Sequence, residues 1–137
     1  MTTINATKGE FVNLINGLFA VSELKGKDFS LTVSENIKTL KEKLEDLENA
    51  GRPSDEFMEL AKQVNEIANE DSEDSKERID KLEEENKELV DSRRKQMDEV
   101  TEMMLEEVSI DLKPISRKVL PEDITAKQIS NLDKIIK

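Results

Sequence analysis

The sequence predicts a mainly α-helical α+β fold, in which a long antiparallel, coiled-coil-like helical hairpin extends from a small base of two short strands and two short helices. Apolar residues recur every three or four positions through the middle of the chain, and they alternate with polar residues over residues 108–113. Charged residues make up 39% of the 137 residues and aromatic residues only 3%, which is typical of long, solvent-exposed helices. We expect a single domain, residues 1–137, with the base formed by residues 1–28 and 108–137 and the hairpin by residues 29–107.

The opening residues predict the first strand and the first helix. Residues 2–6 are rich in β-branched side chains and can form a short strand if another strand pairs with them. Thr7 and Glu10 have the spacing of a capping box, in which a threonine hydroxyl accepts from the third amide of a helix and the glutamate reaches back to the cap. A helix is therefore expected over residues 8–21, followed by a loop. Its apolar face should contain Phe11, Ile15, Leu18 and Phe19.

The first arm of the hairpin is predicted from the strongest periodic pattern in the chain. Its apolar residues follow steps of four and three, which places them on one narrow stripe of a helix. This stripe consists of Phe29, Val33, Ile37, Leu40, Leu44 and Leu47. Gly51 offers a C-terminal cap and Pro53 a first-turn proline, so the helix should break or kink sharply there. A second stripe, displaced by one residue in phase, follows the break and contains Phe57, Leu60, Val64 and Ile67.

The second arm is predicted to begin after residues 69–75, a run of poor helix formers that indicates a turn. The helix that follows should direct five apolar residues inward, namely Ile79, Leu82, Leu89, Val100 and Met103. Three polar residues interrupt the same stripe: Asn86, Arg93 and Gln96. Either these side chains lie within the helical seam, where polar residues can fix register and strand number, or the stripe is shifted and they face water.

The position of the hairpin turn has two alternatives. A turn at residues 51–53 would leave one arm about 33 Å long and the other about 80 Å long, so that much of the second arm would be paired only in an oligomer. A turn at residues 70–75 gives arms of similar length. It also returns the chain to the base, where residues 2–6 can pair with residues 108–113. We therefore favour the turn at residues 70–75.

The last part of the chain predicts a strand and a closing helix. Residues 108–113 alternate apolar and polar side chains, which is the pattern of a half-buried strand, and Pro114 should end it. Thr125 and Gln128 repeat the spacing of a capping box, with Ile124 and Ile129 placed as a hydrophobic staple. The final helix should pack against the base through Ile129, Leu132, Ile135 and Ile136.

The residue types in the chain argue against most catalytic chemistry. Cysteine, histidine, tyrosine and tryptophan are all absent, which removes thiolate nucleophiles, the usual general base at neutral pH and most ligands of transition metals. No phosphate-binding glycine motif occurs. A hydrolase with a pair of carboxylates would need a concave site, which acids spread along thin helices rarely form. We therefore predict a protein that is not an enzyme, with no catalytic, cofactor-binding or metal-binding residues and no cofactor.

One acidic segment resembles a calcium-binding loop on the surface. Oxygen-bearing side chains occupy alternate positions of this segment, namely Asp71, Glu73, Ser75 and Glu77. However, Lys76 stands where such a loop needs glycine, and Leu82 stands where it needs a bidentate glutamate. The favoured interpretation is a solvated acidic turn, which could bind divalent ions weakly.

The charge of the chain restricts its partners. The net charge is −11, and residues 30–107 hold 25 acidic and 12 basic side chains, a net charge of −13. This charge opposes direct binding of nucleic acid, because such binding depends on lysine and arginine displacing counterions from phosphates. No apolar run approaches the roughly 20 residues that span a bilayer, so we expect a soluble protein with no secretory signal and no membrane contact.

Four features occur in order along the chain: the expected opening strand and helix, the loop LKGK at residues 24–27 leading straight into a long charged helix, the segment EVSIDL at 107–112, and LPEDI at 120–124. In this order of elements the chain resembles an uncharacterised family of small proteins from tailed phages and prophages, and the resemblance covers roughly a third of the chain. Residues 51–90 lie outside the resemblance. The family has no established activity, so the resemblance implies a phage context and assigns no functional residues.

Two functional hypotheses follow. The first is a non-catalytic phage-associated macromolecular interaction protein, a minor assembly factor or virion component, that acts in the host cytoplasm or the virion. Its partner would be a phage structural protein or a host protein, and it could also form a homo-oligomer. The alternative is an acidic nucleic-acid-mimicking inhibitor that occupies the basic groove of a host DNA- or RNA-binding protein.

Overall fold

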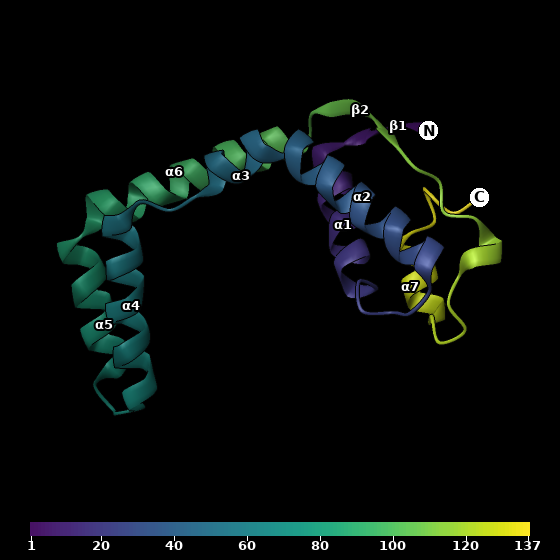
Figure 1. Ribbon diagram of the computed structural model, residues 1–137. Helices are drawn as coiled ribbons and strands as arrows, with labels where there is room; N and C mark the ends of the chain where they lie inside the picture. The colour runs from purple at the N-terminus through teal and green to yellow at the C-terminus, as the bar shows by residue number, and fades with distance from the viewer. The chain divides into compact units, whose positions relative to one another are not determined.

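The computed structural model describes residues 1–137 and contains seven α-helices, one 3-10 helix and one two-stranded antiparallel sheet (Figure 1). This content confirms the predicted mainly α-helical α+β fold class. None of the helices has the apolar length that a membrane crossing requires. The elements in chain order are β1 Thr2–Thr7, α1 Lys8–Ala20, α2 Lys27–Lys43, α3 Glu45–Gly51, α4 Asp55–Glu70, α5 Ser75–Glu85, α6 Lys87–Met104, β2 Glu107–Leu112, η1 Arg117–Val119 and α7 Ala126–Asn131.

The chain is divided into two compact units. The base unit comprises residues 1–47 and 102–137, and the hairpin unit comprises residues 48–101. The main hydrophobic core lies in the base unit, where β1, β2, α1, α2 and the C-terminal segment all contribute buried residues. The sequence predicted a base of residues 1–28 and 108–137. In the structure α2 also belongs to the base unit.

The sheet of the base unit pairs an early and a late segment of the chain, as predicted. β1 and β2 are antiparallel, with Thr2 opposite Leu112 and Thr7 opposite Glu107. Because successive side chains of a strand point to opposite faces, every second residue enters the core. The buried strand residues are Ile4, Ala6, Ile110 and Leu112.

α1 begins with the predicted capping box, since the Glu10 amide donates to Thr7 Oγ1 at 3.1 Å and the Thr7 amide donates to the Glu10 carboxylate. Its buried face contains Phe11, Leu14, Ile15 and Leu18. The expectation for Phe19 is wrong, because this side chain is 45% exposed. The Lys41 ammonium lies 5.2 Å from the centre of the Phe19 ring, which places the ring beneath a cation rather than in the core.

α2 carries the predicted apolar stripe into the core. Phe29, Val33, Leu40 and Leu44 are buried, and Ile37 packs partly buried against them. The expected single helix is interrupted at Leu44, which separates α2 from α3 although its amide still donates to the Leu40 carbonyl. No residue at this position is a helix breaker, and the sequence contains no signal for the interruption.

Asn36 is the one buried polar side chain of the base unit, although its position in the sequence carries no signal of burial. Its Nδ2 donates to the Lys113 carbonyl and its Oδ1 accepts from the Lys113 amide, both at 2.9 Å. The two bonds satisfy the backbone of the residue that follows β2. They tie α2 to the end of the sheet immediately before Pro114, which cannot donate a backbone hydrogen bond.

The C-terminal segment closes the core, but the expected final helix is shorter than predicted. α7 has the predicted capping box of Thr125 and Gln128 and ends at Asn131, so Ile135 and Ile136 lie beyond it. Leu132 and Ile135 are fully buried, whereas Ile129 is 36% exposed and does not pack inward as expected. The Ile115 amide donates to the Ile135 carbonyl, and the Lys137 amide donates to the Ile115 carbonyl. These bonds hold the segment in place without a helix.

The hairpin unit contains the predicted break at Gly51, where α3 ends. The Ser54 hydroxyl accepts from the Phe57 amide at 3.2 Å and caps α4, so Pro53 precedes the cap and does not lie in the first turn as expected. α4 and α5 then pack together as consecutive antiparallel helices joined by residues 71–74 (Figure 1). The turn at residues 70–75 is therefore the correct alternative.

The long helix expected after the turn is broken at Asn86, which separates α5 from α6. The Asn86 side chain donates to the Leu82 carbonyl at 2.8 Å, within its own chain segment. An asparagine that bonds nearby backbone competes with the regular helix, which explains why the interruption occurs at this residue.

Candidate functional site

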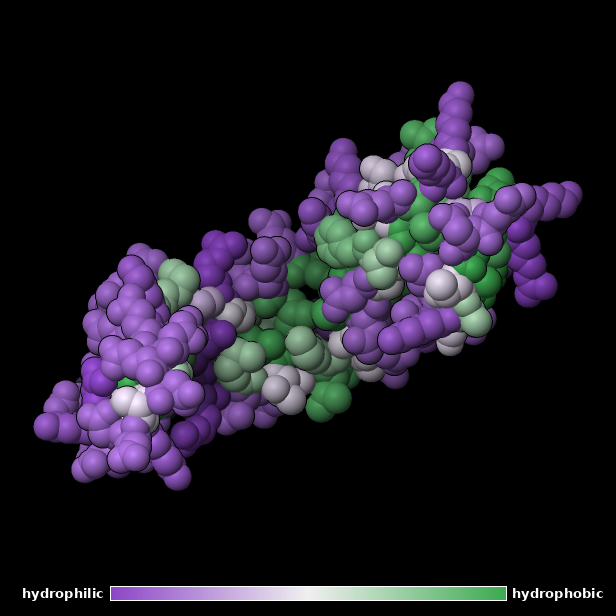
Figure 2. Space-filling model, turned by 90° about the horizontal axis from the view of Figure 1, so that it is seen from below, coloured by the Kyte–Doolittle hydropathy of each residue, from purple (hydrophilic) through white to green (hydrophobic).

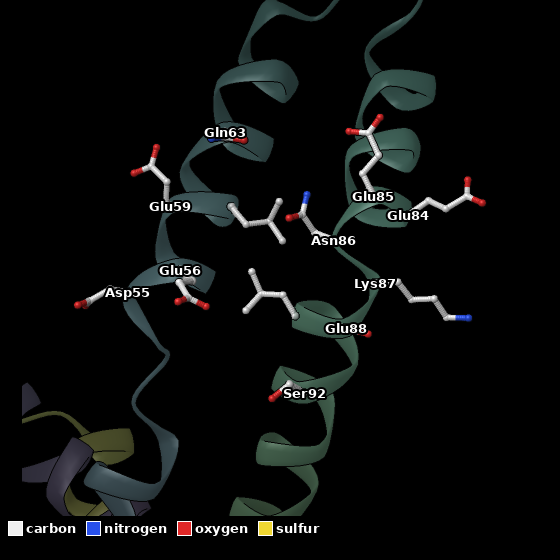
Figure 3. Close-up of a pocket in the computed structure, with 12 residues that line it drawn as sticks. Asp55, Glu56, Glu59, Gln63, Glu84, Glu85, Asn86, Lys87, Glu88 and Ser92 are labelled. Carbon is white, nitrogen blue, oxygen red and sulfur yellow. The ribbon is translucent and has the colours of Figure 1, made fainter.

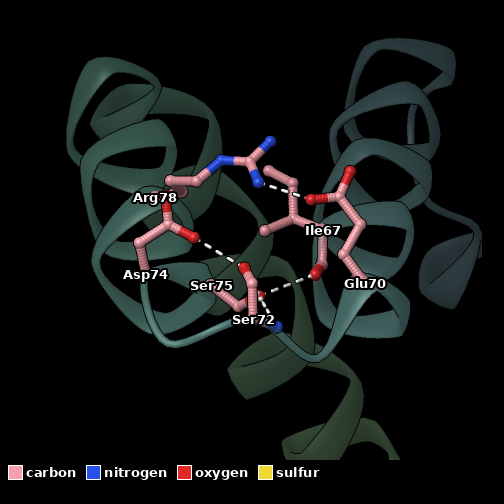
Figure 4. A network of polar contacts seen from close by, with 6 residues as sticks. All are labelled: Ile67, Glu70, Ser72, Asp74, Ser75 and Arg78. Atoms are coloured by element: carbon pink, nitrogen blue, oxygen red, sulfur yellow. Dashed lines mark hydrogen bonds and ion pairs between the residues drawn. The ribbon is translucent and has the colours of Figure 1, made fainter.

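The turn between α4 and α5 is held by a network of side chains from both helices (Figure 4). Ser75 Oγ donates to the Ile67 carbonyl at 3.1 Å and accepts from the Ser72 amide at 3.1 Å. Arg78 and Glu70 form an ion pair across the turn. Asp71 adopts the left-handed conformation, with φ 46°, which reverses the chain after α4. The network therefore fixes how α5 lies along α4.

Two charged groups of this network have shifted pKa values. The hydrogen bond from the Ser72 hydroxyl, 2.6 Å from Asp74 Oδ1, lowers the pKa of the Asp74 carboxyl, and the charge of Arg78 lowers it further. The pKa of Arg78 is raised by its hydrogen bond with Glu70 and by the Glu70 charge. Both groups are therefore held in their charged forms at neutral pH.

Replacing Ser75 with alanine should loosen this turn. The Ile67 carbonyl and the Ser72 amide would lose their partner, at a local cost of about 1–2 kcal/mol. Cleavage by a glutamate-specific protease at residues 70–73, measured by mass spectrometry over time, should become about five- to thirtyfold faster. Ser92→Ala is the matched control, since Ser92 is exposed and should leave the cleavage rate unchanged.

The polar residues Arg93 and Gln96 lie inward and bind the end of α3. Arg93 Nη1 donates to the Gly51 carbonyl at 2.8 Å. Gln96 Nε2 donates to the carbonyls of Ala50 and Arg52 at 2.8 and 2.7 Å. The last carbonyls of a helix have no partner within that helix, so these two side chains supply donors that α3 lacks. This contact favours the interpretation that the two residues fix the register between the arms.

Replacing Gln96 with leucine should test this role. Two carbonyls would lose their donor, which should lower the stability of the hairpin unit by about 1–3 kcal/mol. Hydrogen exchange of the α3 and α6 amides should rise accordingly, while amides of the sheet keep their protection. Lys95→Leu is the control at a neighbouring exposed position, and equal exchange in both variants would contradict the role of Gln96.

A groove opens between α4 and the junction of α5 and α6, and we call it the acidic groove (Figure 3). Its volume is about 1170 Å³, and it is open to solvent. α4 packs along α5 but diverges from the first turns of α6, beyond the break at Asn86. The groove is lined by Asp55, Glu56, Glu59, Leu60, Gln63, Glu84, Glu85, Asn86, Lys87, Glu88, Leu89 and Ser92.

The lining of the acidic groove combines negative charge with apolar side chains. The lining includes six carboxylates and a single ammonium group, that of Lys87. Figure 3 shows that Asp55 and Glu59 on one wall, and Glu84 and Lys87 on the other, are directed away from the opposite wall, so that part of this charge lies along the rims. Leu60, which is buried, and Leu89, which is partly buried, are the apolar residues of the lining. Hydrophilic residues also cover much of the face seen in Figure 2, with hydrophobic residues showing between them.

A second, smaller hollow of about 400 Å³ adjoins Leu60 from the apolar side of α4. Its lining is mainly apolar and includes Phe57, Ala61, Val64, Ala68 and Val90. The Arg93 guanidinium lies over the Phe57 ring, 5.5 Å from its centre. The interior of the hairpin unit is thus only partly filled by its own side chains.

The residues that resembled a calcium loop are used differently. The Ser75 hydroxyl donates to the Ile67 carbonyl, and the Asp74 carboxylate accepts a hydrogen bond from the Ser72 hydroxyl. No group of three acidic residues converges in a way that could hold a metal ion.

The acidic groove itself was missed by sequence reasoning. Its only signal in the sequence is Asn86, a polar residue on an apolar stripe that breaks the helix and allows the two arms to separate. The acids of the lining follow no pattern that distinguishes them from the other exposed acids of the hairpin. In comparisons with known proteins, no protein-family model, no curated protein and no solved structure matches the chain.

Proposed function

We propose that this protein is a non-catalytic, phage-associated interaction protein, a minor assembly factor or virion component, whose hairpin unit is the contact arm. The observation that supports this proposal is the acidic groove, an open surface that combines apolar side chains with excess charge. Residues 48–101 hold 18 acidic and nine basic side chains, a net charge of −9 out of −11 for the chain. The phage context rests on the resemblance of residues 24–27, 107–112 and 120–124.

The alternative is an acidic inhibitor that imitates nucleic acid. The excess of nine negative charges in the hairpin unit favours it, because such a surface attracts basic grooves. Leu60 and Leu89 favour the first proposal, because a leucine floor between carboxylates matches a protein side chain better than a site built for phosphates.

Site-specific photocrosslinking of the full chain in extract from phage-infected cells tests the proposal. A crosslinking amino acid is placed at Met58 of α4 or Met97 of α6, which are 46% and 41% exposed. The matched control position is Leu31 of α2, an apolar residue of the base unit that is 54% exposed. The proposal expects adducts with phage structural proteins from Met58 and Met97 and none from Leu31.

Other outcomes of this experiment separate the alternatives. Adducts with a basic host nuclease, polymerase or defence protein would support the nucleic-acid mimic instead. Adducts from Leu31 alone would show that the contact surface lies on the base unit, and the hairpin would not be the contact arm.

A further inference from the structure

We propose that the acidic groove receives a cationic amphipathic helix of a partner protein. This inference rests on the proposed function and adds the chemistry of the contact. Apolar side chains of the partner helix would pack on Leu60 and Leu89, and its lysine and arginine residues would lie against the carboxylates of the two walls.

The groove is held open from both sides along the hairpin unit. Toward the turn, Ser75 ties α5 to the Ile67 carbonyl of α4. On the other side, Arg93 and Gln96 tie α6 to the last residues of α3. The walls are therefore fixed at two points, and the break at Asn86 lies between them. Since the walls are fixed before a partner arrives, binding requires little reorganisation of this chain.

The dimensions of the groove fit a short stretch of helix. The lining runs over residues 55–63 on one wall and 84–92 on the other, which is about 13 Å of helix on each side. This length matches about two turns of a partner helix, enough for apolar anchors at positions i, i+3 or i+4, and i+7. The groove thus has the form of a helix-binding surface.

The charge of the groove selects among occupants. Six carboxylates and one ammonium favour a basic partner and steer it toward the groove at low ionic strength. A second copy of this chain would place another hairpin unit with a net charge of −9 against the first. Like charges at close range disfavour that pairing, so the occupant is a cationic helix and not a second hairpin unit.

The experiment measures binding of a fluorescent 18-residue peptide, made of leucine, lysine and alanine, to the full chain by anisotropy. Its leucines follow a three-and-four spacing and its lysines flank them. A second peptide has the same composition in scrambled order, and a third has glutamate in place of lysine. The amphipathic cationic peptide should bind about tenfold more tightly than the scrambled one, because only its leucines can reach the groove together.

Substitutions in the groove locate the binding. The triple variant Glu56→Gln, Glu85→Gln and Glu88→Gln should weaken binding about five- to twentyfold, with less effect of added salt than in the unchanged chain. Its control has the same number of neutralised acids outside the groove, at Glu66, Glu73 and Glu77, and should change binding less than about twofold. Leu89→Ala should weaken binding of the amphipathic peptide and leave binding of the scrambled peptide unchanged. Far-UV circular dichroism checks that each variant is folded.

Three results would overturn the inference: equal weakening by both triple variants, binding of the glutamate peptide as tight as that of the lysine peptide, or no binding of the lysine peptide. A dimer of the unchanged chain in light scattering that Leu89→Ala dissociates would also overturn it, because a second copy would then fill the groove. If Met58 still crosslinks phage proteins in the groove triple variant, the proposed function stands and only this inference fails.

Discussion

Replacing Asn36 with leucine should lower the free energy of unfolding of the base unit by about 2–5 kcal/mol. The substitution keeps a side chain of similar size but leaves both the amide and the carbonyl of Lys113 without their partner. Each unsatisfied backbone group in a buried position costs about 1–3 kcal/mol. Asn36 is 1% exposed, but Lys113 is exposed and both residues line an open hollow of about 400 Å³, so water can replace part of the lost bonding and the expected cost lies toward the lower end of this range.

Hydrogen exchange of β1 and β2, followed by mass spectrometry, is the appropriate measurement, since it reports the base unit separately from the hairpin unit. Thr39→Ala is the matched control on the same helix, because the Thr39 hydroxyl donates only to the Glu35 carbonyl one turn earlier. Unchanged exchange of β2 in Asn36→Leu would show that this contact does not stabilise the sheet.

The second large effect is expected from Leu44→Asp, which should cost the base unit about 4 kcal/mol or more. Leu44 is 8% exposed and belongs to the main core, where a carboxylate would be buried without a partner. Leu89→Asp is the matched substitution in the hairpin unit. Leu89 is only partly buried and borders the open groove, so the same change should cost about 1 kcal/mol.

Thermal melts followed by circular dichroism distinguish the two variants. Leu44→Asp should remove the cooperative transition of the base unit, while Leu89→Asp should shift the melting curve only slightly. An equal loss of cooperativity in both would mean that Leu89 lies in a closed seam, and the acidic groove would then not be open in solution.

The elements that the sequence predicted well depend on short-range chemistry. Thr7 with Glu10 and Thr125 with Gln128 each carry a complete capping signal within four residues. The alternation of residues 108–113 identified β2. The pairing of β1 with β2 followed from chain length, because only a turn at residues 70–75 brings the two strands together.

The features that were missed depend on contacts between distant residues. Arg93 and Gln96 bind carbonyls more than 40 positions away, and nothing near them in the sequence indicates which backbone groups lack donors. Asn36 lies beside Ile37 of the apolar stripe, and nothing near it in the sequence indicates that its side chain binds the backbone of Lys113. Asn86 interrupts an apolar stripe, but its neighbours do not show how far α6 then diverges from α4. These properties depend on the packing of whole helices.

The pairing of β1 with β2 has a consequence for synthesis of the chain. Thr2 pairs with Leu112, so the sheet cannot form until more than a hundred further residues have been translated. At about 5–20 residues per second this takes roughly 5–20 s. The helices of the hairpin unit depend on local contacts and can form during that interval. Until β2 emerges, the free edge of β1 and the apolar face of α1 remain uncovered on the ribosome. During this interval these two surfaces are available for a chaperone to bind.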